Sequence, residues 1–292
     1  MLIVNPAAGS SAYKDGFAEA LYELDRSGYR VTPYFTAKRG DATKFAAAYA
    51  ANYECVACIG GDGTLSEVIS GLMHIEEEKR PPVGYFAMGT ANDVATTLDI
   101  PKNNCLKAAK KMIGGKPHPY DVGGFGKDYF AYIAAFGAFT EVSYETPQDM
   151  KKAWGHLAYV LQGAASIQNI ETVHAVVEYD EGTVEGDFIY GSMSNSTSVA
   201  GIVKLPEEMV SLGDGMSELV LVRNPGDAFK FAELINSVLS RTFDSDYMSI
   251  LHTTKAKFIF DKPVAWTRDG EAGGEVTEIE VRNYAHPIQL IF

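Results

Sequence analysis

The segment Gly60-Gly61-Asp62-Gly63-Thr64 combines residue types that bind phosphate. It follows residues 55–59, an apolar run typical of a buried strand, and it precedes a helical pattern whose expected N-cap is Thr64. The glycines let backbone N–H groups turn toward an anion, which a helix N-terminus also favours. Asp62 repels phosphate unless a metal ion or a proton lies between them. The segment therefore predicts a Mg²⁺–phosphate site or a general base, with an ordinary glycine-rich turn as the alternative.

Two further turns of small residues follow other predicted strands. Asn5-Pro6-Ala7-Ala8-Gly9 comes directly after strand 2–4, and Gly89-Thr90-Ala91-Asn92-Asp93 comes after strand 83–87. In a doubly wound parallel sheet, the turns at the carboxyl ends of the strands share one edge. Together the three turns predict a cradle for a polyphosphate. Neither the P-loop pattern nor a strand-linked G-x-G-x-x-G pattern occurs, so the common nucleotide fingerprints are excluded.

The elements that must position these turns change character near residue 120. Before it, strands alternate with helices, which predicts a doubly wound α/β domain over residues 1–120 with a parallel sheet covered on both faces. After it, strand-like runs dominate and predict a mainly antiparallel β-sandwich domain over residues 121–282. The prediction allows residues 283–292 to return to the sheet of the first domain.

The expected boundaries follow from hydrophobic periodicity. In the first domain the strands are expected at 2–4, 30–35, 55–59 and 83–87, and the helices at 12–27, 40–51, 64–77, 91–98 and 104–113. In the second domain strands are expected at 129–136, 172–179, 188–194, 218–222, 257–260 and 277–281, with helices at 150–168 and 228–239.

The composition excludes several classes of protein. The chain has 292 residues, with 38 acidic and 25 basic side chains and a net charge of −13, which argues against a nucleic-acid binder and against a polybasic membrane surface. The apolar run before Pro6 is too short for a signal peptide or a transmembrane span, and no later run approaches that length. We therefore expect a cytoplasmic protein. Cys55 and Cys58 form a CxxC, for which a buried strand explains the pattern better than a metal or redox site.

The three turns together resemble the diacylglycerol kinase catalytic-domain family of lipid kinases, which includes bacterial soluble diacylglycerol kinases and sphingosine-type kinases. GGDGT at 60–64 is shared with NAD kinases and phosphofructokinases, whereas NPAAG at 5–9 and GTAND at 89–93 make the resemblance specific. Matching pieces at 212–216 (LGDGM) and 269–271 (DGE) extend it over nearly the whole chain. From the residues alone, both of these pieces could equally be ordinary tight turns.

The resemblance implies ATP and Mg²⁺ and assigns residues to three sites. The ATP-binding residues are Asn5, Pro6, Ala7, Ala8, Gly9, Thr36, Gly60, Gly61, Asp62, Gly63, Thr64, Leu65, Ser66, Thr90 and Asn92. The catalytic residues are Asp62, expected near Mg²⁺, and the pair Asp269 and Glu271, whose glutamate is the family's proton acceptor. A second, structural Mg²⁺ site consists of Asp214 with the main-chain carbonyls of Ser211 and Met216.

The function implied is ATP- and Mg²⁺-dependent phosphorylation of a lipid hydroxyl, with diacylglycerol as the favoured acceptor and phosphatidic acid as product. Departures at Ala91, Ser194–Lys204, Ser217-Glu218 and Arg268 put the identity of the lipid in doubt more than the kinase chemistry. Two alternatives stay open: a kinase for another acceptor (a sphingoid or other lipid, or NAD), and a non-catalytic nucleotide-binding regulator. A membrane lipid would be reached transiently, by a protein that is cytoplasmic or peripheral at the inner membrane surface. The resemblance is also compatible with a homodimer.

Overall fold

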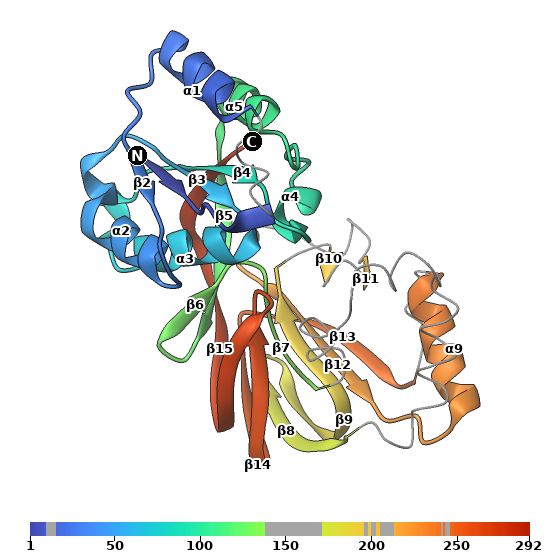
Figure 1. Ribbon diagram of the computed structural model, residues 1–292. Coiled ribbons are helices and arrows are strands. Elements are labelled where there is room, and N and C mark those ends of the chain that lie inside the picture. Colours follow the sequence, from blue (N-terminus) through green and yellow to red (C-terminus); the bar gives the residue numbers. More distant parts are fainter. Residues whose placement is uncertain are drawn as a thin grey trace.

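Four parallel strands carry the three small-residue turns. The computed structural model describes residues 1–9, 16–137, 171–195, 198–199, 203–204, 213–240, 242 and 246–292. The strands are β1 (Leu2–Val4), β2 (Pro33–Phe35), β3 (Val56–Gly60) and β4 (Val83–Ala87). They pair in parallel in the order β2-β1-β3-β4 (Figure 1). The alternation of strands and helices predicted the parallel pairing.

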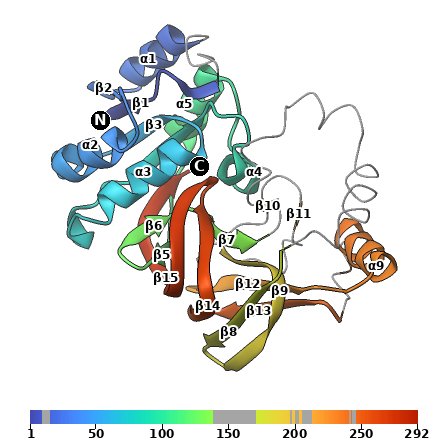
Figure 2. The same ribbon diagram turned by 60° about the horizontal axis from the view of Figure 1, so that its bottom comes forward.

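Helices cover both faces of this sheet, because successive strand residues point to opposite sides. The helices are α1 (Phe17–Arg26), α2 (Asp41–Tyr49), α3 (Asp62–Leu72), α4 (Asp93–Thr97) and α5 (Cys105–Gly114), with short 3₁₀ turns η2 (Ala50–Asn52) and η3 (Glu77–Lys79). Ile3 and Cys58 pack with α2 and α3 in one cluster, whereas Leu2 and Ile59 pack with α1 and α5 in another. Figure 2 shows the sheet lying between these two pairs of helices.

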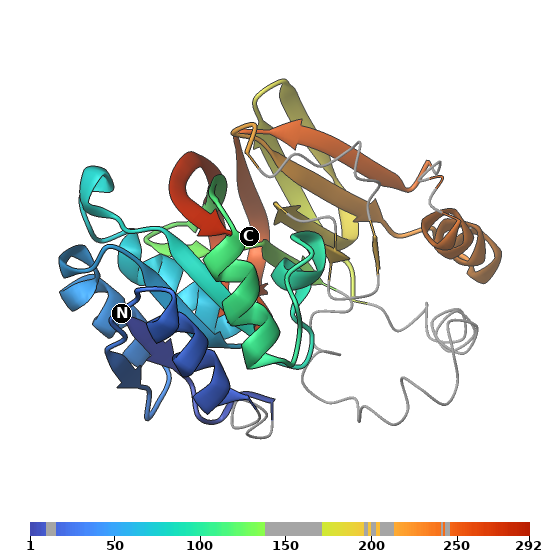
Figure 3. The same ribbon diagram turned by 90° about the horizontal axis from the view of Figure 1, so that it is seen from above.

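The remaining part is rich in antiparallel strands, as predicted. Its strands are β5 (Pro117–Phe125), β6 (Asp128–Phe130), β7 (Ile133–Gly137), β8 (Val173–Tyr179), β9 (Gly182–Ser194), β12 (Ser217–Arg223), β13 (Met248–Thr253), β14 (Lys255–Arg268) and β15 (Glu271–Ile291). A separate small pair consists of β10 (Ser198–Val199) and β11 (Val203–Lys204). Helix α9 (Ala228–Leu239) lies at the periphery (Figure 3).

Two long strands close this part around an aromatic core. Strands β9 and β14 each pair with β8 along their first halves and with β7 along their second halves. The four strands therefore form a closed ring of hydrogen-bonded pairs. Phe136, Phe258 and Trp266 meet inside it, with ring centroids 4.9 to 5.9 Å apart.

Strand β15 joins the two parts. It begins antiparallel to β14, continues antiparallel to β5, and ends parallel to β4 through Leu290 and Ile291. The end of the chain thus returns to the parallel sheet, and both parts share one continuous network of strand pairing. The division into two domains at residue 120 stays a prediction.

Several boundaries differ from the prediction. Helix α3 begins at Asp62 with Gly61 as its N-cap, so the prediction that Thr64 caps the helix is wrong: Thr64 lies inside the first turn. Strands β5, β10, β11 and β13 had no predicted counterpart. In β5, two prolines and two glycines obscure the strand pattern. The predicted helix 150–168 and the start of the predicted helix 12–27 lie outside the described residues. In the part of the chain that the structure describes, no helix has the length and apolar character needed to cross a membrane.

Candidate active site

The three small-residue turns meet at one edge of the parallel sheet. The side-chain amide of Asn5 donates a hydrogen bond to Thr64 Oγ1 at 3.0 Å, which joins the first turn to the start of α3. A Cβ atom added to Gly89 would lie 2.5 Å from Gly61 Cα, so the backbones of the second and third turns touch. Only glycine allows this approach. The common edge predicted for the turns is therefore present.

The turn after β1 is ordered by its own asparagine. Ala7 N donates to Asn5 Oδ1 at 3.0 Å, and Gly9 has a φ of 53°, which glycine adopts without strain. Thr36 follows β2 and donates its N–H to Val4 O at 2.9 Å, which places it beside this turn. The arrangement leaves the turn and the threonine on the same sheet edge.

The predicted ATP-binding residues differ in what they can offer a ligand. The side chains of Ala8, Leu65 and Asn92 are buried, so Ala8 and Leu65 can contribute only main-chain atoms. Asn92 instead orders its own turn, because its side chain accepts from Gly89 N at 2.9 Å and donates to Gly89 O at 2.8 Å. The predicted contacts that are at least partly exposed are Asn5, Pro6, Ala7, Gly9, Thr36, Gly61, Gly63, Ser66 and Thr90.

Asp62 connects the start of α3 to the start of α4. Its Oδ2 accepts from Asp93 N at 3.0 Å, and its Oδ1 accepts from Val94 N at 3.3 Å and from the Tyr85 hydroxyl at 3.4 Å. Burial, together with the nearby carboxylates of Asp93 and Asp269, raises the pKa of Asp62 to about 6 against the opposing effect of the main-chain amides. Acids gathered in this way form an environment that a bound cation would stabilise.

The acidic pair lies in a tight hairpin between β14 and β15. Asp269 and Gly270 have φ values of 49° and 79°, and they separate Arg268 from its strand partner Glu271. Positive φ at both positions is the requirement of a two-residue type I′ turn, for which Asp-Gly is favoured. The hairpin reading and the acidic-site reading of the sequence are thus compatible.

Asp269 holds this hairpin on the loop before β7. Its carboxylate accepts from Ala131 N at 2.6 Å, from Tyr132 N at 2.9 Å and from Ile133 N at 3.1 Å. Burial raises the pKa of Asp269, although these amides and the hydroxyl of Ser66 oppose the shift. With its oxygens occupied by the protein, Asp269 is suited to fix the position of its neighbours rather than to take a proton from an acceptor.

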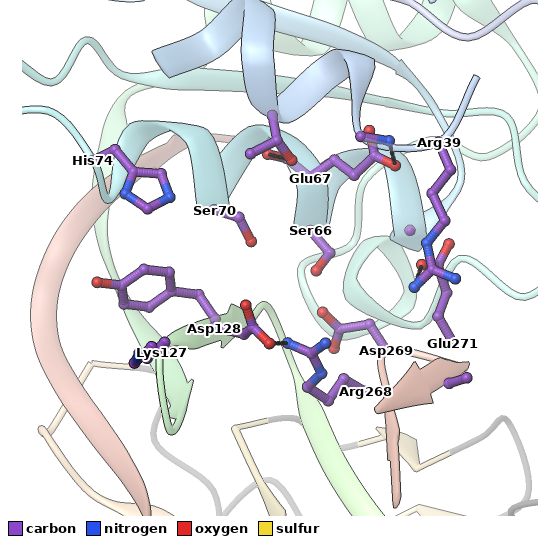
Figure 4. Close-up of a pocket in the computed structure, with 15 residues that line it drawn as sticks. Arg39, Ser66, Glu67, Ser70, His74, Lys127, Asp128, Arg268, Asp269 and Glu271 are labelled. Carbon is purple, nitrogen blue, oxygen red and sulfur yellow. Dashed lines mark hydrogen bonds and ion pairs between the residues drawn. The ribbon is translucent and has the colours of Figure 1, made fainter. Parts of the chain in front are cut away.

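Glu271 reaches from this hairpin to the glycine-rich turn. A Cβ atom added to Gly63 would lie 2.9 Å from Glu271 Oε1, so the carboxylate rests against the backbone of α3's first turn. Its other oxygen accepts from Arg39 Nη2 at 2.7 Å. Both side chains line a pocket of about 210 Å³ between the α2–α3 layer and the hairpins of the β-rich part (Figure 4). Other side chains of this pocket are those of Ser66, Glu67, Ser70, Asp128 and Arg268.

Asp214 and Met216 lie at a second acidic place. Asp214 Oδ1 accepts a hydrogen bond from Met216 N at 2.9 Å. Asp121 also holds this turn, because its Oδ2 accepts from Gly215 N at 2.8 Å. Neither Asp214 nor Met216 is among the residues that line the pocket around Glu271. Ser211, the remaining predicted ligand, lies outside the described residues.

Buried acids surround this second turn. Asp121 is fully buried and also accepts from Asn283 Nδ2 at 2.9 Å and from His286 N at 2.8 Å. Glu218 is 1% exposed, its Oε2 has no partner among the described residues, and burial raises its pKa to about 8, with smaller effects from Asp214 and Asp121. A divalent cation prefers oxygen ligands, so it would suit the buried carboxylate of Glu218, which has an oxygen without a hydrogen-bond partner and lies near Asp121 and Asp214. Among the described residues no three acidic, His or Cys side chains could hold a metal by themselves, so main-chain carbonyls would have to contribute.

Residues 1–125 match the family described as diacylglycerol kinase catalytic domain. A diacylglycerol kinase of Bacillus subtilis (strain 168) is 30% identical over 98% of this chain and 93% of its own length. The chain belongs to the diacylglycerol kinase family. A diacylglycerol kinase of Staphylococcus aureus (strain Newman) is 34% identical over 94% of this chain and 86% of its own length.

Solved structures share the fold of this chain. The chain superposes over its full length on two crystal structures from Bacillus anthracis str. Sterne. One has a TM-score of 0.83 at 23% identity and is covered to 94%; the other, of a diacylglycerol kinase, has a TM-score of 0.73 at 20% identity and is covered to 95%. At these identities the likeness concerns the fold. Membership of the diacylglycerol kinase family, shown by the sequence relatives, makes the chain a kinase that phosphorylates a hydroxyl group.

Three residues of this diacylglycerol kinase-family site were missed from the sequence. Asp93 donates its N–H to Asp62 and is itself buried, although it was treated only as the last residue of the GTAND turn. Asp121 could have been identified from the sequence, because a single acid within the apolar run of β5 requires buried hydrogen-bond partners. Arg39 had no comparable signal, since its meeting with Glu271 depends on the tertiary fold.

Proposed function

We propose that this chain is an ATP- and Mg²⁺-dependent lipid kinase that transfers the γ-phosphoryl group of ATP to a lipid hydroxyl, with diacylglycerol as acceptor and phosphatidic acid as product. The observation that carries the proposal is the position of the Glu271 carboxylate against Gly63, in the first turn of α3. A proton acceptor there would stand beside phosphates bound at the helix N-terminus.

Different residues of the chain would bind the phosphates of ATP and accept the proton of the acceptor hydroxyl. Backbone N–H groups of the three turns would hold the phosphates of ATP, while Asn5, Thr36 and Thr90 stand at the same edge. The acceptor oxygen forms a bond to the γ-phosphorus, the bond to the bridging oxygen breaks, and ADP leaves. Glu271 takes the proton of the acceptor hydroxyl.

Two groups of acidic residues would hold Mg²⁺. Asp62 and the acids near it would face the catalytic ion. The structural ion would be held by Asp214 and the main-chain carbonyl of Met216, with the family's third ligand, the carbonyl of Ser211, outside the described residues. When bound, Mg²⁺ supplies neutralisation of the charge that moves onto the leaving ADP.

The pocket and the net charge support a neutral lipid as acceptor. The pocket of about 210 Å³ is lined by hydroxyl and charged side chains such as Ser66 and Ser70, which suits a polar head with a free hydroxyl. A protein with a net charge of −13 is repelled by an anionic surface, so a neutral diacylglycerol reached transiently at the inner membrane surface fits better than permanent electrostatic binding.

Measuring ATP consumption with separate acceptors tests this function. Diacylglycerol, sphingosine and NAD are each offered with Mg²⁺ and with EDTA, and the phosphorylated product is identified. We expect phosphatidic acid from diacylglycerol with Mg²⁺ alone. Turnover restricted to sphingosine or NAD would reassign the acceptor, and ATP binding without any turnover would identify a non-catalytic nucleotide-binding protein.

A matched pair of variants tests the proton acceptor. Glu271→Gln should lower turnover by at least about 10²-fold, because general-base catalysis contributes about 10²–10⁴-fold. Glu275→Gln removes an exposed acid from the same strand and should leave turnover unchanged. Equal rates for both variants would remove the role assigned to Glu271.

A further inference from the structure

The ion pair between Arg39 and Glu271 joins two distant segments at the pocket. Arg39 Nη2 lies 2.7 Å from Glu271 Oε2, and the two side chains are 63% and 40% exposed. An ion pair this exposed contributes little to the stability of the fold. The stability of the fold therefore does not explain why an arginine occupies position 39. The effect of Arg39 on the Glu271 carboxylate is a better explanation.

The backbone that carries Arg39 is firmly held. Ala37 N and Lys38 N both donate to Asp41 Oδ2, at 2.9 and 3.0 Å. Gly40 N donates to Glu67 Oε1 at 2.8 Å. These hydrogen bonds fix the loop before α2 internally and attach it to α3. The backbone of Arg39 is therefore held in place while its side chain lines the pocket.

The other acids that line the pocket have main-chain amides or a more buried arginine as partners. Glu67 accepts from two main-chain amides at the start of α2, and Asp269 accepts from three before β7. Asp128 pairs with Arg268, whose side chain is only 20% exposed. Glu271 instead pairs with the guanidinium of Arg39, whose side chain is 63% exposed.

We propose that Arg39 is a positioning residue for phosphoryl transfer, which holds the carboxylate of Glu271 beside Gly63. This inference rests on the proposed role of Glu271 as proton acceptor. The planar guanidinium suits a carboxylate because it presents its N–H donors in a fixed geometry, which the ammonium of lysine does not. Without Arg39, the Glu271 side chain turns freely about its own bonds and spends less time in the productive position.

Turnover of single variants tests the proposal, with diacylglycerol, ATP and Mg²⁺ as substrates. Arg39→Ala should lower kcat by about 10-fold or more, since small misplacements of catalytic groups cost up to about 10²-fold. The KM for ATP should change by less than about 2-fold, because a group that acts only in the transition state leaves ground-state binding intact. Arg39→Lys should recover only part of the loss.

Two additional measurements separate positioning from a structural effect. Added guanidinium ion should partly restore the kcat of Arg39→Ala, and it should not raise that of the wild type. In a Glu271→Gln background, Arg39→Ala should cause no further loss, because the group it positions is already gone. Arg30→Ala serves as the matched control, since Arg30 makes an equally short, exposed ion pair with Asp25 next to α1, and this variant should behave as wild type.

Specific results would overturn the inference. Unchanged kcat in Arg39→Ala would do so while leaving the lipid-kinase function intact. A raised KM for ATP at unchanged kcat would reassign Arg39 to nucleotide binding, and a further loss in the Glu271→Gln background would show that Arg39 acts on another group. Failure of the wild type to phosphorylate any acceptor would instead overturn the proposed function, and with it this role of Arg39.

Discussion

Asn5 and Thr64 link the first and second small-residue turns through one hydrogen bond, from Nδ2 to Oγ1 at 3.0 Å. Because Asn5 also accepts from Ala7 N, it orders its own turn and aligns that turn with α3 at the same time. Neither turn can move far without breaking this bond, so the spacing of the turns is set before a nucleotide binds.

Removing this bond should weaken ATP binding. A neutral hydrogen bond is worth about 0.5–1.5 kcal/mol, so Asn5→Ala and Thr64→Val should each lower the affinity for ATP by about 2- to 12-fold in calorimetric titrations. The double variant should lose less than the sum of the two, because both changes remove the same contact. Additive losses would indicate that the two side chains act independently. Asn104→Ala, at the N-cap of α5, is the control for a general loss of stability.

The contact between Gly61 and Gly89 makes a different prediction. In Gly89→Ala the new Cβ would lie 2.5 Å from Gly61 Cα, so the second and third turns must separate. Overpacking of this kind costs about 1–3 kcal/mol, and we expect the KM for ATP to rise by at least about 10-fold. Gly114→Ala meets no atom within 4 Å and should leave the KM unchanged. Equal kinetics for the two variants would show that the close approach is dispensable.

Substitution of Asp269 should mainly lower stability, whereas substitution of Glu271 should mainly lower activity. Asp269→Asn replaces one acceptor oxygen by a donor opposite three main-chain amides, and a hydrogen bond to a charged group contributes about 1.5–3 kcal/mol. We therefore expect urea unfolding to reveal a loss of at least about 2 kcal/mol. Glu271→Gln breaks only an exposed pair and should lose at most about 1 kcal/mol while abolishing most turnover. A stable Asp269→Asn protein would contradict the anchoring role.

Asp62 should make stability depend on pH below neutrality. Its pKa is about 6 in the folded chain against an ordinary value of 3.8, so the folded state keeps this proton to higher pH than the unfolded state does. From pH 4 to 6 its contribution to the free energy of unfolding should therefore fall, by up to about 3 kcal/mol, and stay constant above pH 6. Urea unfolding of wild type and Asp62→Asn across this range measures the difference. A wild-type stability that rises relative to the variant would contradict the assigned shift.

The second acidic site predicts an effect of Mg²⁺ on thermal stability. Binding to the folded state alone raises the melting temperature as the Mg²⁺ concentration increases. Asp214→Asn should reduce this rise, and Glu218→Gln should reduce it as well, because an amide cannot lose a proton and become a charged ligand when a cation binds. Asp227→Asn, an exposed acid at the N-cap of α9, should leave the Mg²⁺ response intact. A full response in Asp214→Asn would place the ion elsewhere.

The sequence was sufficient where local chemistry determines structure. Strand β4 and helix α9 agree with their predicted residues, because hydrophobic periodicity and turn residues define them. The common edge of the three turns followed from the parallel alternation alone. The start of α3 was misplaced by two residues, because Thr64 is used by Asn5 instead of capping the helix. Asp62 fills the first position of that helix.

Contacts between distant residues were beyond local patterns. Asp269-Gly270 could be read as a turn or as part of an acidic pair, and only the amides of residues 131–133 decide how Asp269 is used. The pairing of Arg39 with Glu271 depends on the loop before α2 and the β14–β15 hairpin meeting at α3. Likewise, Asp121 supports the 213–216 turn through a contact that no spacing rule describes.

Strand β15 has a consequence for how the enzyme is made. It supplies Glu271 at its start and, at its end, the partner that covers the edge of β4. During synthesis the N-terminal strands leave the ribosome first and begin to fold, yet β4 keeps an unpaired edge until β15 has been translated. The nascent chain therefore completes all three small-residue turns long before it contains Glu271, so the two sides of the pocket can come together only after nearly the whole chain has been made.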